Sequence, residues 1–256
     1  MKPYQQIPIF DCGEPLVPIP LKQFAVETPH PYVAVGASYG NKSPYYLREG
    51  VLARLIQAQR SLQSQYPGWQ IQIFDAYRPI TVQQYMVDYT FTQTVSQKGC
   101  KVEDLSAIDR QTILEQVYQF WAVPSPNLAT PPPHSTGAAI DITLVDATGN
   151  PVNMGSPIDE LSVRSYPDYF AQPSAPELAE TLPGDQDLSE GDRQMIHQNR
   201  QQLKQVMLAA GFCQHPKEWW HFSFGDQFWA WQLNQDNPGK RQVARYGRVT
   251  EWDEDD

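Results

Sequence analysis

The sequence has 256 residues, of which 41% are hydrophobic and 19% are charged, so it is long enough to bury a sizeable core. Its formal net charge is −10, and five of the acidic residues fall within residues 251–256, which leaves the rest of the chain only mildly acidic. This balance excludes the basic surface typical of nucleic-acid binding, and no apolar run reaches the roughly 18 residues of a membrane helix.

Three cysteines, Cys12, Cys100 and Cys213, are widely scattered along the chain. An odd number without C-x-x-C spacing argues against a disulfide framework and against a thiolate metal site, and it favours a reducing compartment. The first ten residues contain no apolar segment of the signal-peptide kind. We therefore expect a cytoplasmic protein, with an unconventional route to the periplasm left open; the sequence carries no signal for an oligomeric state.

The first half of the chain predicts an arm, one strand and several helices. Residues 1–45 are rich in proline and aromatic residues, which favours an extended arm packed on the body. Apolar residues at helical spacing predict a helix over 48–65, and the alternation over 69–73 predicts a half-buried strand. Further helices are expected over 81–94 and 104–120.

The second half alternates loops with regular elements. The pattern predicts a proline-rich loop over 124–133, a strand over 138–145 and a hairpin turn over 146–150. A long polar loop over 156–190, a helix over 189–210 and a final aromatic strand over 218–224 are expected to follow. Helices and short strands follow no regular βαβ period, so we predict an α+β fold with a small, mainly antiparallel sheet packed against helices. We expect one domain over 1–250 and an acidic tail over 251–256.

The segment His134-Ser135-Thr136-Gly137-Ala138-Ala139-Ile140-Asp141 pairs a loop imidazole with a strand carboxylate. Both groups are good zinc ligands, and a zinc site needs three or four ligands. Small residues between them allow the backbone to curl closely. On these two residues alone, a plain loop histidine and a strand-edge acid remain the commoner interpretation.

The segment Glu218-Trp219-Trp220-His221 places an ionisable pair among bulky rings. An aromatic core strand with a satisfied histidine is the alternative interpretation. Burial among so many rings would desolvate both groups, which then need a charge partner or a metal. Because residues three apart in a strand face opposite sides, Glu218 can share a site with His221 only from the strand entrance or a bulge.

The segment Asp75-Ala76-Tyr77-Arg78-Pro79 comes at the end of the predicted strand over 69–73. An arginine held by a following proline can aim its planar guanidinium at a carboxylate or a developing oxyanion. A surface arginine in a turn is the simpler interpretation of this segment taken alone.

Together the three segments resemble the D-alanyl-D-alanine dipeptidase family, the vancomycin-resistance type of zinc D,D-peptidase with a hedgehog-like fold. That family carries Asp-x-Tyr-Arg-Pro, then Ser-x-His-x-x-Gly-x-Ala-x-Asp, then Glu-x-x-His. The matching residues occur here in the same order, and the resemblance spans roughly residues 30–225. One departure is Pro132, which stands where the family has serine, so a hydroxyl near the substrate is lost.

The resemblance implies a role for each matched residue. His134, Asp141 and His221 would hold one Zn²⁺ per chain, and Glu218 would be the general base. Arg78 would polarise the scissile carbonyl and stabilise the oxyanion. Three further residues would serve the substrate end of the site, namely Asp75 as a support, Asp159 as the partner of the substrate amine and Tyr32 as a substrate contact.

The implied activity is zinc-dependent hydrolysis of the small dipeptide D-alanyl-D-alanine to two molecules of D-alanine. One alternative is another peptidoglycan peptidase of the same fold, either a D,D-carboxypeptidase or an L-alanyl-D-glutamate endopeptidase. A second alternative is a zinc-binding relative without catalysis, although Glu218 and Arg78 speak against it. For Asp159, a loop residue that caps a turn after Pro157 is an equally good interpretation from position alone.

Overall fold

The protein is described by a computed structural model that covers residues 2–171, 182, 185–236 and 239–250. Its helices are α1 (Pro31–Ala34), α2 (Glu49–Gln65), α3 (Ile80–Gln97), α4 (Ala107–Val117), α5 (Glu190–Ala209) and α6 (Gln227–Asp236). Its strands are β1 (Leu16–Pro18), β2 (Ala25–Val26), β3 (Tyr46–Arg48), β4 (Gln70–Asp75), β5 (Ala139–Val145), β6 (Cys213–Gln214) and β7 (His221–Ser223). The mixture confirms the predicted α+β class.

The main sheet has five strands in the order β2-β4-β5-β7-β6, and β1 and β3 form a separate antiparallel pair. Within the main sheet only the β2–β4 pair is parallel, so the sheet is mainly antiparallel as predicted. Strand β2 belongs to the proline-rich arm, which therefore contributes an edge strand. None of the helices in the described ranges has the length and apolar character to cross a membrane.

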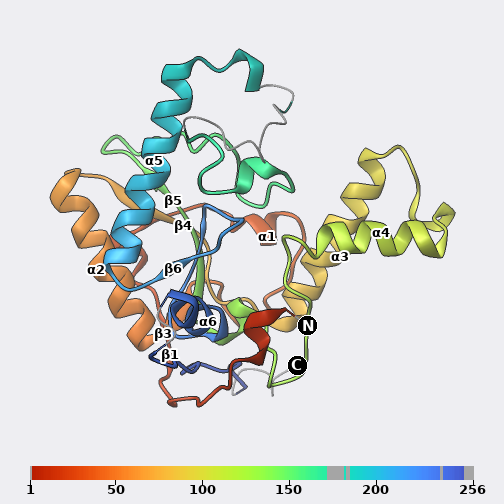
Figure 1. The fold of residues 1–256 in the computed structure, drawn as a ribbon, viewed down its shortest axis with the longest axis horizontal. Helices are drawn as coiled ribbons and strands as arrows, with labels where there is room; N and C mark the ends of the chain where they lie inside the picture. Colours follow the sequence, from red (N-terminus) through yellow and green to blue (C-terminus); the bar gives the residue numbers. More distant parts are fainter. Residues whose placement is uncertain (1, 172–181, 183–184, 237–238, 251–256) are drawn as a thin grey trace.

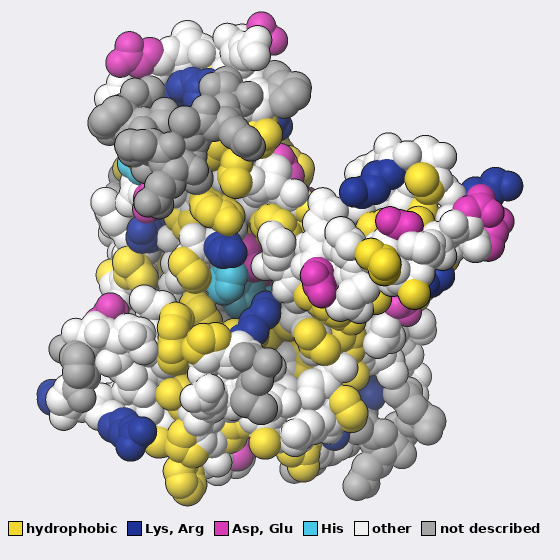
Figure 2. Space-filling model, turned by 45° about the vertical axis from the view of Figure 1, so that its right-hand side comes forward, with side chains coloured by type: hydrophobic (Ala, Val, Ile, Leu, Met, Phe, Trp, Pro, Cys, Tyr) yellow, Lys and Arg dark blue, Asp and Glu magenta, His cyan; other side chains and the backbone are white. Residues whose placement is uncertain are grey.

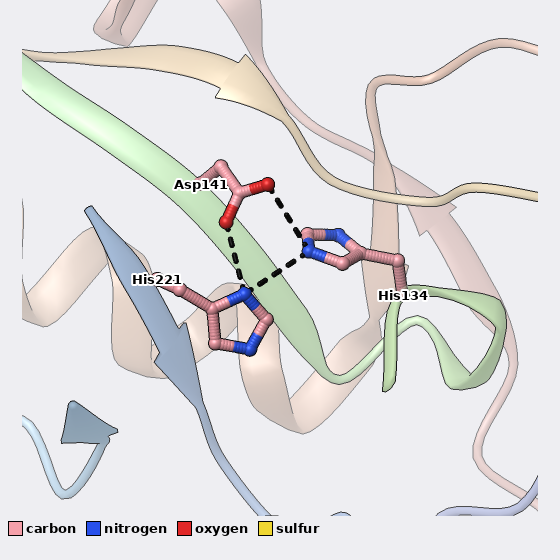
Figure 3. Close-up of side chains that lie close together, drawn as sticks. All are labelled: His134, Asp141 and His221. Carbon is pink, nitrogen blue, oxygen red and sulfur yellow. Dashed lines mark hydrogen bonds and ion pairs between the residues drawn. The ribbon is translucent and has the colours of Figure 1, made fainter. Parts of the chain in front are cut away.

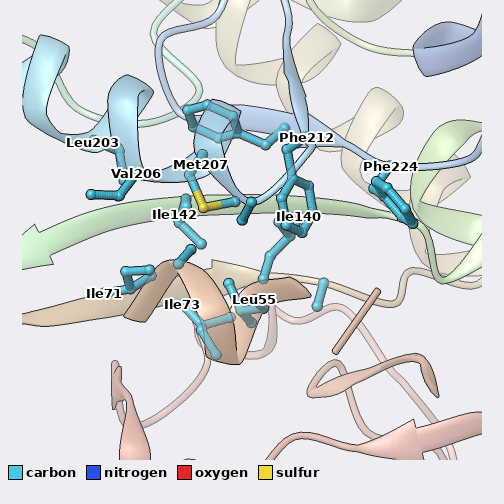
Figure 4. Packing of buried hydrophobic residues seen from close by; sticks show 14 of the residues in the cluster. Leu55, Ile71, Ile73, Ile140, Ile142, Leu203, Val206, Met207, Phe212 and Phe224 are labelled. Carbon is cyan, nitrogen blue, oxygen red and sulfur yellow. The ribbon is translucent and has the colours of Figure 1, made fainter. Parts of the chain in front are cut away.

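One face of the sheet is apolar because side chains alternate along each strand. Ile140, Ile142 and Leu144 of β5 are fully buried and belong to the core cluster that includes Leu55 of α2 and Met207 of α5 (Figure 4). Helices α2 and α5 thus cover this face. The alternate residues of the central strands point to the opposite face, where polar side chains gather.

A second apolar cluster, with residues of α1, α3 and α4, lies on the polar side of the main sheet. Phe74 of β4 packs against this cluster, which includes Tyr32 and Trp121. Helices α3 and α4 project together away from the sheet at the right of the molecule (Figure 1). The polar face of the sheet therefore borders an aromatic wall.

One predicted strand differs from the structure, and one helix of the structure was not predicted. The strand predicted over 218–224 is only β7, because Trp219 and Trp220 lie in a turn whose end is closed by a hydrogen bond from the His221 N–H to the Glu218 carbonyl. The two bulky indole side chains are buried, and we interpreted this run of apolar residues as a strand although it reflects burial alone. Helix α6 was not predicted, since its aromatic run masks the helical period. Residues 251–256 and most of the predicted loop segment 172–184 lie outside the described residues.

Gly137 provides a test of the local backbone that carries His134. It ends the short helix η4 (Pro133–Thr136) in the left-handed region at φ 68°, and a side chain there would collide with Leu16. We expect Gly137→Ala to lower the free energy of unfolding by about 1–3 kcal/mol, measured by urea unfolding. Gly191→Ala, in the first turn of α5, is the control, because an added Cβ would meet only the Ser189 hydroxyl at an ordinary contact distance of 3.7 Å; it should be neutral or slightly stabilising. Equal effects of the two substitutions would contradict this account.

Candidate metal centre and active site

The strand register brings three polar residues into one row on the polar face of the sheet. Asp141 of β5 is the direct cross-strand partner of both Asp75 of β4 and His221 of β7. The β4–β5 register shifts between Ile73 and Asp75. Without this bulge Asp75 would share the apolar face with Ile73, so the irregularity turns its carboxylate toward the row.

His134 reaches the same row from helix η4, which precedes β5. Its Nε2 lies 3.2 Å from the Asp141 carboxylate and 3.2 Å from Nδ1 of His221, and the latter atom lies 2.9 Å from the other Asp141 oxygen. Figure 3 shows the three side chains converging on one point. All three are buried, and they form the group suited to a metal ion among the described residues.

The hydrogen bonds of the two histidines orient their rings so that one nitrogen of each faces this point. Nδ1 of His134 lies 2.7 Å from the Ala76 carbonyl oxygen, which can only accept, so Nδ1 donates and Nε2 is the nitrogen that faces Asp141 and His221. Nε2 of His221 lies 3.4 Å from the Ser223 hydroxyl, which in turn donates to Asp226. One nitrogen of each imidazole and a carboxylate therefore converge, an arrangement that suits a bound cation.

The spacing of these donor atoms also fits a metal. Ligands at about 2.0–2.1 Å from a tetrahedral ion lie roughly 3.3 Å apart, close to the observed separations. Although burial alone would raise the pKa of Asp141, the facing His134 and His221 hold it well below its ordinary value. Asp141 thus supplies a full negative charge.

Asp75 is a fully buried carboxylate beside the metal group. It accepts hydrogen bonds from Tyr39 and from Arg78 at 2.9 Å, and Nε2 of His30 lies 3.2 Å away. Burial would raise the pKa of Asp75, but Arg78 and then the two nearby histidines His30 and His134 lower it below its ordinary value. Hydrogen-bond donors and cationic groups therefore compensate the buried negative charge of Asp75.

Arg78 is held in one orientation by five contacts. Its guanidinium donates to Asp75, Gln83, Tyr32 and Asp141 at 2.9–3.2 Å and lies 5.0 Å from the ring centre of Trp121. Burial opposes its charge, but the surrounding acidic groups keep the pKa of Arg78 well above its ordinary value. A fixed cation thus lies at the edge of the metal group.

Tyr32 connects Arg78 to Asp159. Its hydroxyl accepts from Arg78 at 3.0 Å and donates to Asp159 at 2.9 Å. Asp159 has φ 65°, an uncommon conformation for a residue other than glycine. Burial, and then the negative charge of Asp141, raise the pKa of Asp159 to about 7. This part of the site therefore offers a half-buried carboxyl group, and no cationic side chain of the described residues forms an ion pair with it.

Glu218 lies at the entrance of β7, one of the two positions that the spacing argument allowed. Its carboxylate is 3.8 Å from Nδ1 of His221 and 3.4 Å from Nδ1 of His215. It is only 8% exposed, and this burial raises its pKa to about 7. Glu218 is thus a proton acceptor of intermediate strength beside the metal group rather than a member of it.

The eight residues singled out in the sequence form one connected set of contacts around a cavity. The cavity is lined by the three metal-site residues together with Glu218, Arg78 and Asp159. Figure 2 shows histidine side chains at the bottom of a hollow, with positively charged groups at its edge.

Sequence analysis missed several residues that support the site. His215 contacts Glu218, and Ser223 and Asp226 support His221. His30 and Tyr39 support Asp75 from the arm. The position of Ser223, two residues after His221 on the same strand, was the one local signal that could have indicated a shared face.

Comparison with known proteins identifies the family of the chain. The family model described as D-ala-D-ala dipeptidase matches residues 26–181 and 189–238. A D-alanyl-D-alanine dipeptidase of Synechocystis sp. is 51% identical over 249 residues, which cover 97% of each chain. Proteins with the same description from Escherichia coli and Enterococcus faecalis are 36% and 30% identical over 89 and 95 residues, about a third of each chain. The chain belongs to the D-ala-D-ala dipeptidase family and is an enzyme of the peptidase class.

The raised pKa of Glu218 predicts a pH-dependent stability for the metal-free protein. Between pH 4.5 and about 7 the folded protein keeps a proton on Glu218 that the unfolded chain has lost, so this residue lowers the free energy of unfolding as the pH rises. Glu218→Gln should remove the penalty and stabilise the protein by up to about 3 kcal/mol at pH 8, with the gain shrinking toward pH 4.5.

Urea unfolding in the presence of a chelator, at a series of pH values, measures this effect. Glu103→Gln, at an exposed position far from the site, is the matched control and should differ from the wild type equally at every pH. A Glu218→Gln difference that does not change with pH would contradict the raised pKa.

Proposed function

We propose that this chain hydrolyses D-alanyl-D-alanine to two molecules of D-alanine, with one zinc ion held by His134, Asp141 and His221. The observation that carries the proposal is the convergence of three metal-ligand atoms, from His134, Asp141 and His221, beside Glu218, a carboxyl group with a pKa of about 7 that is not part of the donor group. Its wider support is the similarity to the Synechocystis dipeptidase along 97% of the chain.

Zinc fits the donor set, because two imidazoles and one carboxylate leave a tetrahedral ion one open position. When bound, zinc would supply the Lewis acidity that brings the pKa of water near 7 and polarises a carbonyl group. The choice of zinc over other divalent ions also agrees with the resemblance of the sequence to zinc peptidases.

Glu218 would act as the general base and then as the general acid. A carboxyl group with a pKa of about 7 can take a proton from the attacking water and return it to the leaving amine at neutral pH. Its neighbours are buried, so the proton transfer takes place away from bulk solvent. This step accounts for both proton transfers with one residue.

Arg78 would stabilise the negative charge that develops on the carbonyl oxygen. It lines the cavity, stays charged, and is fixed by Asp75 and Gln83, so little reorganisation is needed when charge appears. Asp75 would act through Arg78 and through His134, rather than on the substrate itself.

The free amine of the dipeptide would be bound by Asp159 with the Tyr32 hydroxyl beside it. Asp159 lines the cavity and accepts a hydrogen bond from Tyr32, and a bound ammonium would favour the ionised form of Asp159. An amine requirement would distinguish the dipeptidase from a D,D-carboxypeptidase or an endopeptidase that acts on longer wall peptides.

The direct test is release of D-alanine by the purified, zinc-loaded protein from a panel of dipeptides. We expect rapid cleavage of D-alanyl-D-alanine, and slow cleavage of the L,L and N-acetylated dipeptides. Cleavage of longer wall peptides in preference to the free dipeptide would overturn the proposal and favour the carboxypeptidase or endopeptidase alternative. Zinc binding without any hydrolysis would favour the binding protein.

Metal content and activity should separate the ligands from the base. His221→Ala should lose both zinc and hydrolysis, whereas Glu218→Gln should keep a full zinc equivalent and lose about 10²–10⁴-fold in kcat. Zinc is measured by atomic absorption after dialysis, with His197→Ala of α5 as the control that should retain both properties. Full zinc occupancy in His221→Ala, or zinc loss in Glu218→Gln, would contradict the assignment.

Asp159 should contribute to substrate binding through the amine. Asp159→Asn should raise KM for D-alanyl-D-alanine and lower kcat/KM by about 10- to 100-fold, while the zinc content stays full. N-acetylation of the substrate should cause a similar loss in the wild type and little further loss in the variant, because both changes remove one interaction. Equal cleavage of the free and acetylated dipeptides by the wild type would show that no amine pocket exists.

A further inference from the structure

Lys2, in the extended arm, lines the same cavity as the metal group and Glu218, although it is 132 positions away from His134 in the sequence. It directly precedes helix η1 (Pro3–Gln6), and its side chain is half-buried. The family match begins at residue 26, so Lys2 lies outside the part of the chain that the family model describes.

The arm is fixed against the body at this point. Tyr4 packs edge-on against Phe228 of α6, with ring centres 5.9 Å apart. The Gln227 side chain donates to the Ile7 carbonyl at 2.7 Å, and the Lys2 backbone N–H donates to the side chain of Gln5 at 2.8 Å. These contacts hold Lys2 at the edge of the cavity, so its position there does not depend on a free chain end.

Lys2 and Arg78 are the lysine and arginine residues that line this cavity among the described residues. Arg78 already donates to two carboxylates, Gln83 and Tyr32, whereas no carboxylate in the described ranges lies within ion-pair distance of the Lys2 ammonium. Burial lowers the pKa of Lys2, although the charge of Glu218 opposes this effect. A half-buried ammonium without an ion-pair partner is suited to binding an anion that enters the cavity.

The cavity lining carries groups of opposite charge preference. Asp159 accepts a hydrogen bond from Tyr32, which is bonded to Arg78. Lys2 is close enough to Glu218 for their charges to interact, and it lies two residues before Tyr4, which packs on α6. A dipeptide with free ends carries an ammonium at one end and a carboxylate at the other. Such a substrate matches this polarity when its amine faces Asp159.

We infer that the Lys2 ammonium binds the free carboxylate of the dipeptide and thereby selects substrates that end one residue after the cleaved bond. This inference rests on the proposed dipeptidase function. Lys2 contributes binding energy to a part of the substrate that does not react, so it lowers KM and leaves kcat nearly unchanged. The arm thus completes the specificity of a site whose catalytic residues all lie elsewhere.

The test compares D-alanyl-D-alanine with D-alanyl-D-alaninamide, whose end is neutral. The zinc-loaded protein carries its purification tag at the C-terminal end, so that nothing is added ahead of the arm. Lys2→Met should raise KM for the dipeptide by about 10- to 100-fold and change KM for the amide by less than about threefold. Lys2→Arg should recover most of the loss, and the wild type should prefer the dipeptide to the amide by a similar factor.

Lys217→Met is the matched control, because Lys217 is an exposed lysine that immediately precedes Glu218 in the sequence and does not line the cavity. It should leave both KM values unchanged. Thermal unfolding of each variant checks that the arm remains docked, and Lys2→Gln provides a second variant with a polar side chain.

Three results would overturn the inference. Equal losses on the dipeptide and the amide would mean that Lys2 acts through Glu218 or through the packing of the arm. No loss on either substrate would mean that Lys2 does not contact the substrate. If the wild-type enzyme fails to cleave D-alanyl-D-alanine at all, the proposed function falls together with this inference, a result distinct from the other two.

Discussion

The buried carboxylate of Asp75 is the interaction on which the rest of the site depends. A fully buried negative charge is tolerable only with several donors around it, and Asp75 gathers Tyr39, His30 and Arg78 from separate parts of the chain. Arg78 is oriented by this charge, and Nδ1 of His134 lies 3.4 Å from the Asp75 oxygen that accepts from Arg78. The arm, the sheet and the metal group are therefore linked through one anion.

The main sheet places the residues around Asp75 next to the metal group. Antiparallel register places Asp141 between Asp75 and His221, while alternation sends the intervening isoleucines into the core beneath α2 and α5. The same strands thus build the hydrophobic core with one face and the metal group with the other. A change in register by one residue would exchange the two faces and abolish both.

The sequence predicted the elements and residues whose signals are local. Helix α2, strand β5 and the three short segments around Arg78, Asp141 and His221 could be found because periodicity and short motifs report on neighbours along the chain. Strand geometry limited Glu218 to the strand entrance or a bulge, provided that it shares a site with His221. The contribution of Lys2 could not be predicted, because it depends on tertiary contacts between the arm and α6 that leave no pattern in the sequence.

The most direct test of the metal centre is anomalous diffraction at the zinc absorption edge from crystals grown with zinc. The account predicts one strong peak per chain, bonded to Nε2 of His134, to the Asp141 carboxylate and to Nδ1 of His221, with Glu218 nearby but not bonded. A peak bonded to Nε2 of His221, a peak that includes Glu218, or zinc bound at a different place would contradict it.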